Sequence, residues 1–196
     1  MAWQSDPVRA VDVAVVSAAP ALLAVLPAER ETVHHPGGTA VVVRIGPLLV
    51  AIEPPAPPGG VLHARHRLFA GVARGFPPVR PGDVLVPSGV IGRPAYRPDA
   101  RLFALARGTQ PDDWIPDHFA HSPAVHLGPM LDRIEGRTTS SKAIGATDEP
   151  ADGYSLVVLG ALDAGADPVL RADAAGAAAA FTLALLSRLA AEQPLN

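Results

Sequence analysis

The sequence predicts an α/β fold of three layers, in which helices cover both faces of a central mixed, mostly parallel β-sheet. Short apolar, β-branched runs alternate with stretches of helical character along the chain, which favours a covered sheet of this kind. The clearest strand is VDVAVV at residues 11–16, a nearly continuous apolar run that is typical of a strand buried on both faces. Because the chain has 196 residues, we expect one domain over residues 1–196.

Composition excludes several classes of function. The net charge of −3 provides no attraction to nucleic acid or to an anionic membrane, so we expect neither as a partner. The chain has no cysteine, which excludes disulfides, thiolate chemistry and cysteine-based zinc sites. Its first residues lack the pattern of a signal peptide, and the apolar run at residues 174–186 is shorter than the ~20 residues of a membrane span. We therefore expect a cytoplasmic protein.

The first part of the chain is expected to form a strand, a helix and a hairpin. Pro20 fits the first turn of the helix. The polar segment at residues 29–38 is expected to be a loop. Two apolar runs then meet at Gly46 and Pro47, which predicts a hairpin. Residues 53–60 hold four prolines and two glycines in EPPAPPGG, and we expect a stiff surface loop there.

The middle of the chain is less regular. Residues 61–69 fit a helix or a strand, and we favour a helix. The small residues at 70–75, AGVARG, predict a loop. VLVP at residues 84–87 predicts a strand, and an extension of this strand to Ile91 is left open. A short helix is expected to begin near Asp99, which can cap its N-terminus, and to end near Ala106.

The last part of the chain contains the segment on which the prediction of function depends. We expect irregular structure at residues 108–123, a short strand at residues 124–127 and a long polar loop at residues 132–153. A buried strand at residues 156–159 then leads through an acidic turn into an apolar, alanine-rich helix at residues 172–189.

Asp163 lies in that acidic turn. In an open α/β sheet, a carboxylate just past the C-terminal end of a central strand lies on the edge where ligands bind. An aspartate that caps a turn or helix is the structural alternative.

Several stretches, in the same order along the chain, resemble the nucleoside phosphorylase and nucleosidase superfamily. AGVARGFPPVRPGDVLV at residues 70–86 is similar to the family's "TGSAGG" loop and the "GDVVV" strand after it, and VHLGPM at residues 125–130 is similar to "VHFGPI". Residues 159–167 resemble the "RGISDYAD" turn, and the alanine-rich helix resembles the family's last helix. VAVVSAAPALLAVL at residues 13–26 resembles its start, "IAIVTALPVELEAVL".

The resemblance implies a phosphorylase/hydrolase-like fold, a purine nucleoside or related small molecule as ligand, and no cofactor. It implies that Asp163 is the acid that protonates, or hydrogen-bonds to, N7 of the purine as the glycosidic bond breaks. A partly buried carboxyl with a raised pKa suits that task. Relatives of this fold commonly assemble, so a homo-oligomer is also open.

The resemblance also implies four ligand-binding positions in the small-residue segment and one at the end of VHLGPM. The small residues Gly71, Ala73 and Gly75 would let backbone amides approach an anion or a sugar, although a plain tight turn fits them equally. Arg74 either contacts the phosphate or carboxylate of a ligand, or its side chain is simply solvated. Met130 is the last of the five.

Two family features are missing. Where the nucleosidases carry a water-activating acid in the first β-α turn, this chain has Ala21 and Leu22, and the family's ribose-binding glutamate has no match at its usual spacing. Glu53, Glu135 or Glu149 would have to replace the missing acid. Activity is therefore open: the alternatives are a catalytically degenerate binding or scaffold protein and an enzyme repurposed for other chemistry.

The histidines do not predict a metal site. His63 and His66 are spaced for one helix face, and His118, His121 and His126 lie further along the chain. Zinc needs three or four ligands held together, and these histidines are neither tightly spaced nor on one element. We expect no metal.

Overall fold

The structure is a computed structural model. It describes residues 10–17, 21–35, 38–55, 63–92, 95–109, 123–132, 142–147, 153–163 and 168–192. The strands are β1 (Ala10–Ser17), β2 (Arg30–His35), β3 (Gly38–Ile45), β4 (Leu48–Glu53), β5 (His63–Gly75), β6 (Val84–Ile91), β7 (Val125–Asp132), β8 (Gly145–Thr147) and β9 (Leu156–Leu162). The helices are α1 (Ala21–Val25), α2 (Ala100–Gly108) and α3 (Pro168–Ala191).

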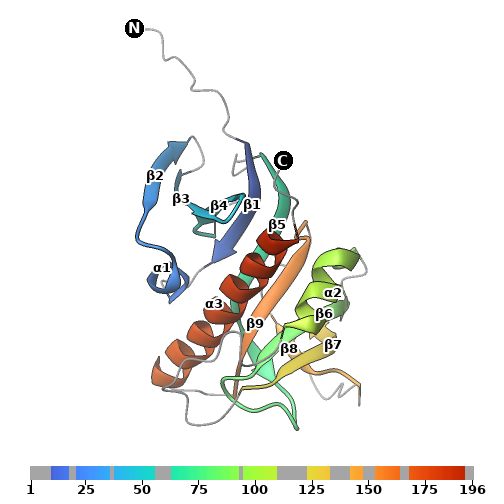
Figure 1. The fold of residues 1–196 in the computed structure, drawn as a ribbon. Helices are drawn as coiled ribbons and strands as arrows, with labels where there is room; N and C mark the ends of the chain where they lie inside the picture. The colour runs from blue at the N-terminus through green and yellow to red at the C-terminus, as the bar shows by residue number, and fades with distance from the viewer. Residues whose placement is uncertain are drawn as a thin grey trace, which may run out of the picture.

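The strands form one mixed sheet in the order β2-β3-β4-β1-β5-β8-β7-β6-β9 (Figure 1). Because β9 also pairs with β5, the last five strands of this order close into a barrel. Among the described residues, five of the nine strand pairings are parallel. The predicted mixed sheet is confirmed, whereas the closed barrel was not predicted.

All three described helices meet through α3, which packs on β9, β5, β6 and β3 and contacts both α1 and α2. Figure 1 shows α3 running along β9. A second helical layer is not among the described residues, so the three-layer arrangement stays a prediction. By length and composition alone, residues 171–191 of α3 could cross a membrane. In the fold, Phe181 and Leu185 of this helix are fully buried against the sheet.

The strand β5 overturns two predictions. Residues 61–69 were expected to be a helix and residues 70–75 a loop, but residues 63–75 form one strand. It pairs with β1 on one side and with β9 on the other. The pairing partners lie far away in the sequence, and such tertiary contacts override weak local preference.

Three other segments also differ from the prediction because they pair with strands elsewhere in the chain. The predicted loop at residues 29–38 contains β2, which pairs antiparallel with β3. The strand predicted at residues 124–127 continues as β7 through Gly128 and Pro129 to Asp132, opposite an irregularity in β6 between Pro87 and Gly89. The long loop predicted at residues 132–153 contains β8, which pairs with β5 and β7. Residues 56–60 of the proline-rich segment and residues 110–122 lie outside the described residues.

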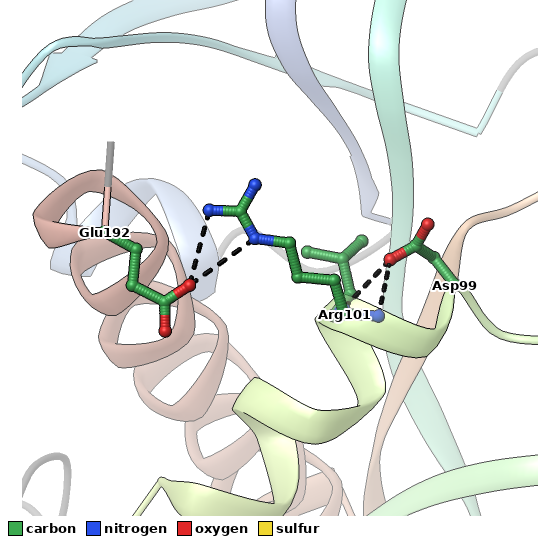
Figure 2. Close-up of polar contacts among 4 residues, drawn as sticks. Asp99, Arg101 and Glu192 are labelled. Atoms are coloured by element: carbon green, nitrogen blue, oxygen red, sulfur yellow. Dashed lines mark hydrogen bonds and ion pairs between the residues drawn. The ribbon is translucent and has the colours of Figure 1, made fainter. Parts of the chain in front are cut away.

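Other elements match the prediction closely. The β3–β4 hairpin turns at Gly46, whose φ of 54° favours glycine. Asp99 caps α2: its Oδ1 accepts hydrogen bonds of 3.0 Å from the backbone N–H groups of Arg101 and Leu102. Figure 2 shows this cap and the exposed ion pair at 3.3 Å between Arg101 and Glu192, which joins α2 to the end of α3.

The sheet separates two main clusters of buried side chains. Successive residues of a strand point to opposite faces. On β5 and β9, Leu68, Leu156 and Val158 pack toward α3. Phe69, Val157 and Leu159 of the same strands point the other way, into the barrel interior.

Candidate ligand site at the barrel mouth

The sheet forks along one edge of β5, where the pairing strand changes from β1 to β8. β1 pairs with β5 as far as Ala70, and β8 pairs with it from Arg74 onward. Among the described residues, no strand pairs with residues 71–73 on this side, although β9 pairs with them on the other. In open α/β sheets, ligands bind at the C-terminal edge where neighbouring strands diverge.

Asp163 directly follows β9 at the same end of the barrel. Leu162 is the register partner of Arg74, so Asp163 lies level with Gly75. The side chain of Asp163 is exposed. Ala161 and Leu159 face the barrel interior, and the alternation along the strand continues that face to Asp163. The structure therefore brings three predicted site residues, Arg74, Gly75 and Asp163, to one end of the barrel, which we call the barrel mouth.

The small residues of β5 have a packing role that their sequence did not reveal. They belong to a strand and not to the expected loop. A Cβ added to Gly71 would lie 2.5 Å from Cε1 of Phe69, and one added to Gly75 would lie 2.5 Å from Cγ1 of Val79. Ala73 is itself buried in the barrel interior. The narrow barrel accounts for these small residues, and their contact with a ligand stays a prediction.

Arg74 and Met130 have contrasting environments. Arg74 is exposed, and its guanidinium lies 5.9 Å from the ring centroid of Phe76. Met130 is fully buried in the barrel interior with Leu85 and Leu159, and its register partner on β8 is Gly145. Met130 therefore forms part of the core beneath the mouth, and a direct ligand contact by its side chain stays a prediction.

Asp83 and His126 form a polar pair at the barrel mouth that the sequence did not predict. Asp83 Oδ2 lies 2.8 Å from His126 Nε2, and the two side chains are 3% and 22% exposed. Both carboxylate oxygens of Asp83 also accept backbone hydrogen bonds, Oδ1 from Ala124 and Oδ2 from Arg80, each at 2.9 Å. The backbone carbonyl of Asp83 accepts from Ala161 of β9 at 2.7 Å.

The sequence contains a local signal for each member of this pair. His126 alternates with Met130 on a strand, so both face the barrel interior once the strand is known to continue past Pro129. Asp83 follows Gly82, whose φ of 88° favours glycine and marks a tight turn before β6. What the sequence could not provide is the pairing of β6 with β7, which brings the two residues together.

Of the three glutamates that could replace the acid missing from the first turn, only Glu53 is among the described residues, and it lies away from Asp163. Ala21 begins α1, and Leu22 is fully buried. Glu53 is buried at the end of β4, but its register partner is Val16 on β1. Val16 in turn pairs with Phe69 of β5, and Phe69 pairs with Val157 of β9. Glu53 therefore lies three strands from β9, level with a residue six positions before Asp163. Glu135 and Glu149 lie outside the described residues.

Two titratable groups with shifted pKa values lie away from the mouth. Burial lowers the pKa of His66, which is near the start of β5, and Asp99 partly opposes this effect. Burial raises the pKa of Tyr96, whose hydroxyl accepts a hydrogen bond of 3.1 Å from the backbone N–H of Val157. Within the described residues there is no group of three or more side chains that could hold a metal ion. His118 and His121 lie outside them.

Solved structures identify the fold. The methylthioadenosine/S-adenosylhomocysteine nucleosidase of Colwellia psychrerythraea, in complex with adenine, matches with a TM-score of 0.61 and 15% identity over 92% of this chain and 96% of that one. A methylthioadenosine phosphorylase from an Antarctic soil metagenomic library matches with a TM-score of 0.64 and 14% identity, over 94% and 88%. A futalosine hydrolase mutant of Helicobacter pylori matches with a TM-score of 0.63 and 10% identity, over 91% and 99%.

Sequence comparison alone finds less: no protein-family model and no curated protein matches the chain. The chain has a nucleoside phosphorylase/nucleosidase-like fold, as the resemblance predicted.

Proposed function

We propose that this chain, which has the fold of nucleoside phosphorylases and nucleosidases, binds a purine nucleoside or a related small molecule at the barrel mouth. In this proposal Asp163 is the acid that protonates the purine as the N-glycosidic bond breaks. The bond between C1′ of the sugar and the purine weakens as a proton reaches the ring, because the leaving base then departs without negative charge.

The observation that carries the proposal is the position of Asp163 beside the fork of β5. The register places Asp163 level with Gly75, at the C-terminal ends of two neighbouring parallel strands. The fork leaves the backbone of residues 71–73 without a strand partner on one side among the described residues. Backbone groups of this kind can hydrogen-bond a ligand, and an exposed carboxyl lies next to them.

A second candidate is a protein that binds the ligand without cleaving it. The first turn favours it, because the start of α1 carries Ala21 and a fully buried Leu22 in place of an acid. In this alternative the barrel mouth keeps its affinity for a purine, and Asp163 serves as a hydrogen-bonding group only.

Purine release from inosine, adenosine and methylthioadenosine, measured with and without phosphate, separates the two candidates. For the enzyme, we expect turnover in the wild type and a loss of about 100-fold or more in Asp163→Asn, because the amide cannot supply the proton. Asp173→Asn, a change on the exposed surface of α3, is the matched control and should retain activity. Absence of turnover together with thermal stabilisation by a nucleoside indicates the binder.

Three further features belong to the same proposal. The protein works in the cytoplasm, consistent with the burial of the apolar face of α3 in the fold. It forms a homo-oligomer, which sedimentation would detect. The third feature is the three-layer arrangement, with helices on both faces of the sheet.

A further inference from the structure

Asp83 is the centre of the hydrogen bonds beneath the barrel mouth. Its carboxylate accepts from the turn before β6 through Arg80, from the start of β7 through Ala124, and from the imidazole of His126. A carboxylate that is 3% exposed and bonded at both oxygens is held in one orientation. It therefore fixes the ring of His126 from one side.

The orientation of His126 follows from this contact. Asp83 accepts hydrogen bonds, so Nε2 of His126 is the donor in the 2.8 Å contact. A neutral imidazole that donates from Nε2 carries its lone pair on Nδ1. Among the described residues, Nδ1 of His126 has no hydrogen-bond partner. With 22% of the side chain exposed, water can reach the ring.

Asp83 lies close to Asp163, and His126, the register partner of Leu85, lies one strand further from β9. The backbone bond between Asp83 and Ala161 places these residues on neighbouring strands, and Asp163 comes two residues after Ala161. A strand spacing of about 4.8 Å and a rise of about 3.3 Å per residue then separate the Cα atoms of Asp83 and Asp163 by about 8 Å. Leu85 and Leu159, which are register partners, both face the barrel interior. Asp83 and Asp163 share that face by alternation.

We propose that His126 is a general base that activates water at the barrel mouth, with Asp83 as the residue that positions it. This inference rests on the proposed function, and it narrows that function to hydrolysis. It assigns to a histidine on β7 the role of the acid that is missing from the first turn. Glu53 is a poorer candidate, because it lies three strands from β9 and level with Val157, which comes six residues before Asp163.

The proposed step is a hydrolysis that consumes one water molecule. The water oxygen attacks C1′ of the nucleoside, and the bond between C1′ and the purine nitrogen breaks, with its electron pair leaving on the purine. The proton of the attacking water passes to Nδ1 of His126, and the proton of Asp163 passes to the purine ring. The products are the free purine and the sugar. Solvent then takes the proton from His126 and returns one to Asp163.

The substitution His126→Gln tests this role with little risk to the fold. The glutamine amide can still donate to Asp83, but it has no basic nitrogen. We expect kcat for purine release from methylthioadenosine to fall by about 10²–10⁴-fold, while the Kd for adenine stays within about twofold and the melting temperature is nearly unchanged. His63→Gln, at the exposed start of β5, is the matched control and should behave as the wild type. Turnover in the wild type should not require phosphate.

Each other outcome is decisive. If the wild type cleaves the nucleoside and His126→Gln cleaves it equally fast, the base is not His126, and the proposed function stands. If the wild type binds adenine but cleaves none of the three nucleosides, the base is again overturned, and the binding function stands. If the wild type neither binds nor cleaves, both proposals are wrong. A kcat that falls together with the melting temperature would show that His126 is structural.

Discussion

The two faces of the central strands differ in what they bury. Toward α3, the strands present Leu68, Val84 and Leu156 to a helix that supplies Phe181 and Leu185, and these packed side chains are apolar. In the barrel interior the same strands pack apolar side chains in the middle, but at the mouth the interior face carries Asp83 and His126.

The comparison shows how one set of strands separates stability from function. Because side chains alternate, one residue contributes to the α3 core while the next can carry chemistry. A buried charge is tolerated at the mouth because backbone donors and His126 satisfy it. We therefore expect changes on the α3 side to affect stability alone, and changes in the barrel to affect stability and ligand binding together.

The largest expected effect on stability comes from Gly160, where β9 meets α3. A Cβ at this position would lie 1.8 Å from the backbone oxygen of Ala174, so the helix would have to move. Gly160→Ala should lower the free energy of unfolding by about 3 kcal/mol or more in urea denaturation. Gly176→Ala, with nothing within 4 Å of the added Cβ, is the control and should stabilise by up to about 1 kcal/mol. Equal stability of Gly160→Ala and the wild type would contradict the packing of α3 on β9.

A smaller loss of stability, joined to a loss of binding, is expected at Gly145 in the barrel. Its added Cβ would lie 2.3 Å from the backbone oxygen of Arg74, which pushes β8 away from β5 and opens the barrel at the mouth. Gly145→Ala should cost about 1–3 kcal/mol of stability and weaken adenine binding about tenfold or more in calorimetry. Gly89→Ala, whose Cβ would meet nothing within 4 Å, is the control. Loss of stability with full affinity would separate the barrel from the ligand site.

The smallest effect is expected at the joint between α2 and α3 (Figure 2). Asp99 donates its backbone N–H to Ser155 just before β9, at the opposite end of that strand from Asp163. Asp99→Ala removes two capping bonds and should cost about 1 kcal/mol of unfolding free energy. Glu192→Ala removes only an exposed ion pair and should change the stability by less than about 1 kcal/mol. Neither variant should alter nucleoside binding, and a change in affinity would show that the α3 side is not independent of the mouth.

Local signals explain which parts of the fold could be predicted. The buried run of β1, the turn at Gly46, the Asp99 cap and the apolar helix α3 all depend on neighbours in the sequence, and all four are confirmed. The strand β5 was missed because its stability comes from β1 and β9, which lie elsewhere in the chain.

The candidate site also contains residues that could be predicted from local sequence and residues that could not. Asp163 could be chosen from the sequence because it follows a buried strand within a turn that resembles a known family, although its role is untested. The pair of Asp83 and His126 could not be chosen, because 43 residues separate its members and only the β6–β7 pairing joins them. The small residues of β5 were recognised, but their packing against Phe69 and Val79 requires the closed barrel.

A crystal structure of the protein with adenine would show directly whether the barrel mouth is the ligand site. We predict that the purine lies at the barrel mouth, with a ring nitrogen within about 3.2 Å of the Asp163 carboxyl and the ring beside residues 71–75 of β5. Adenine bound elsewhere on the molecule, or no binding in calorimetry at millimolar concentration, would contradict it.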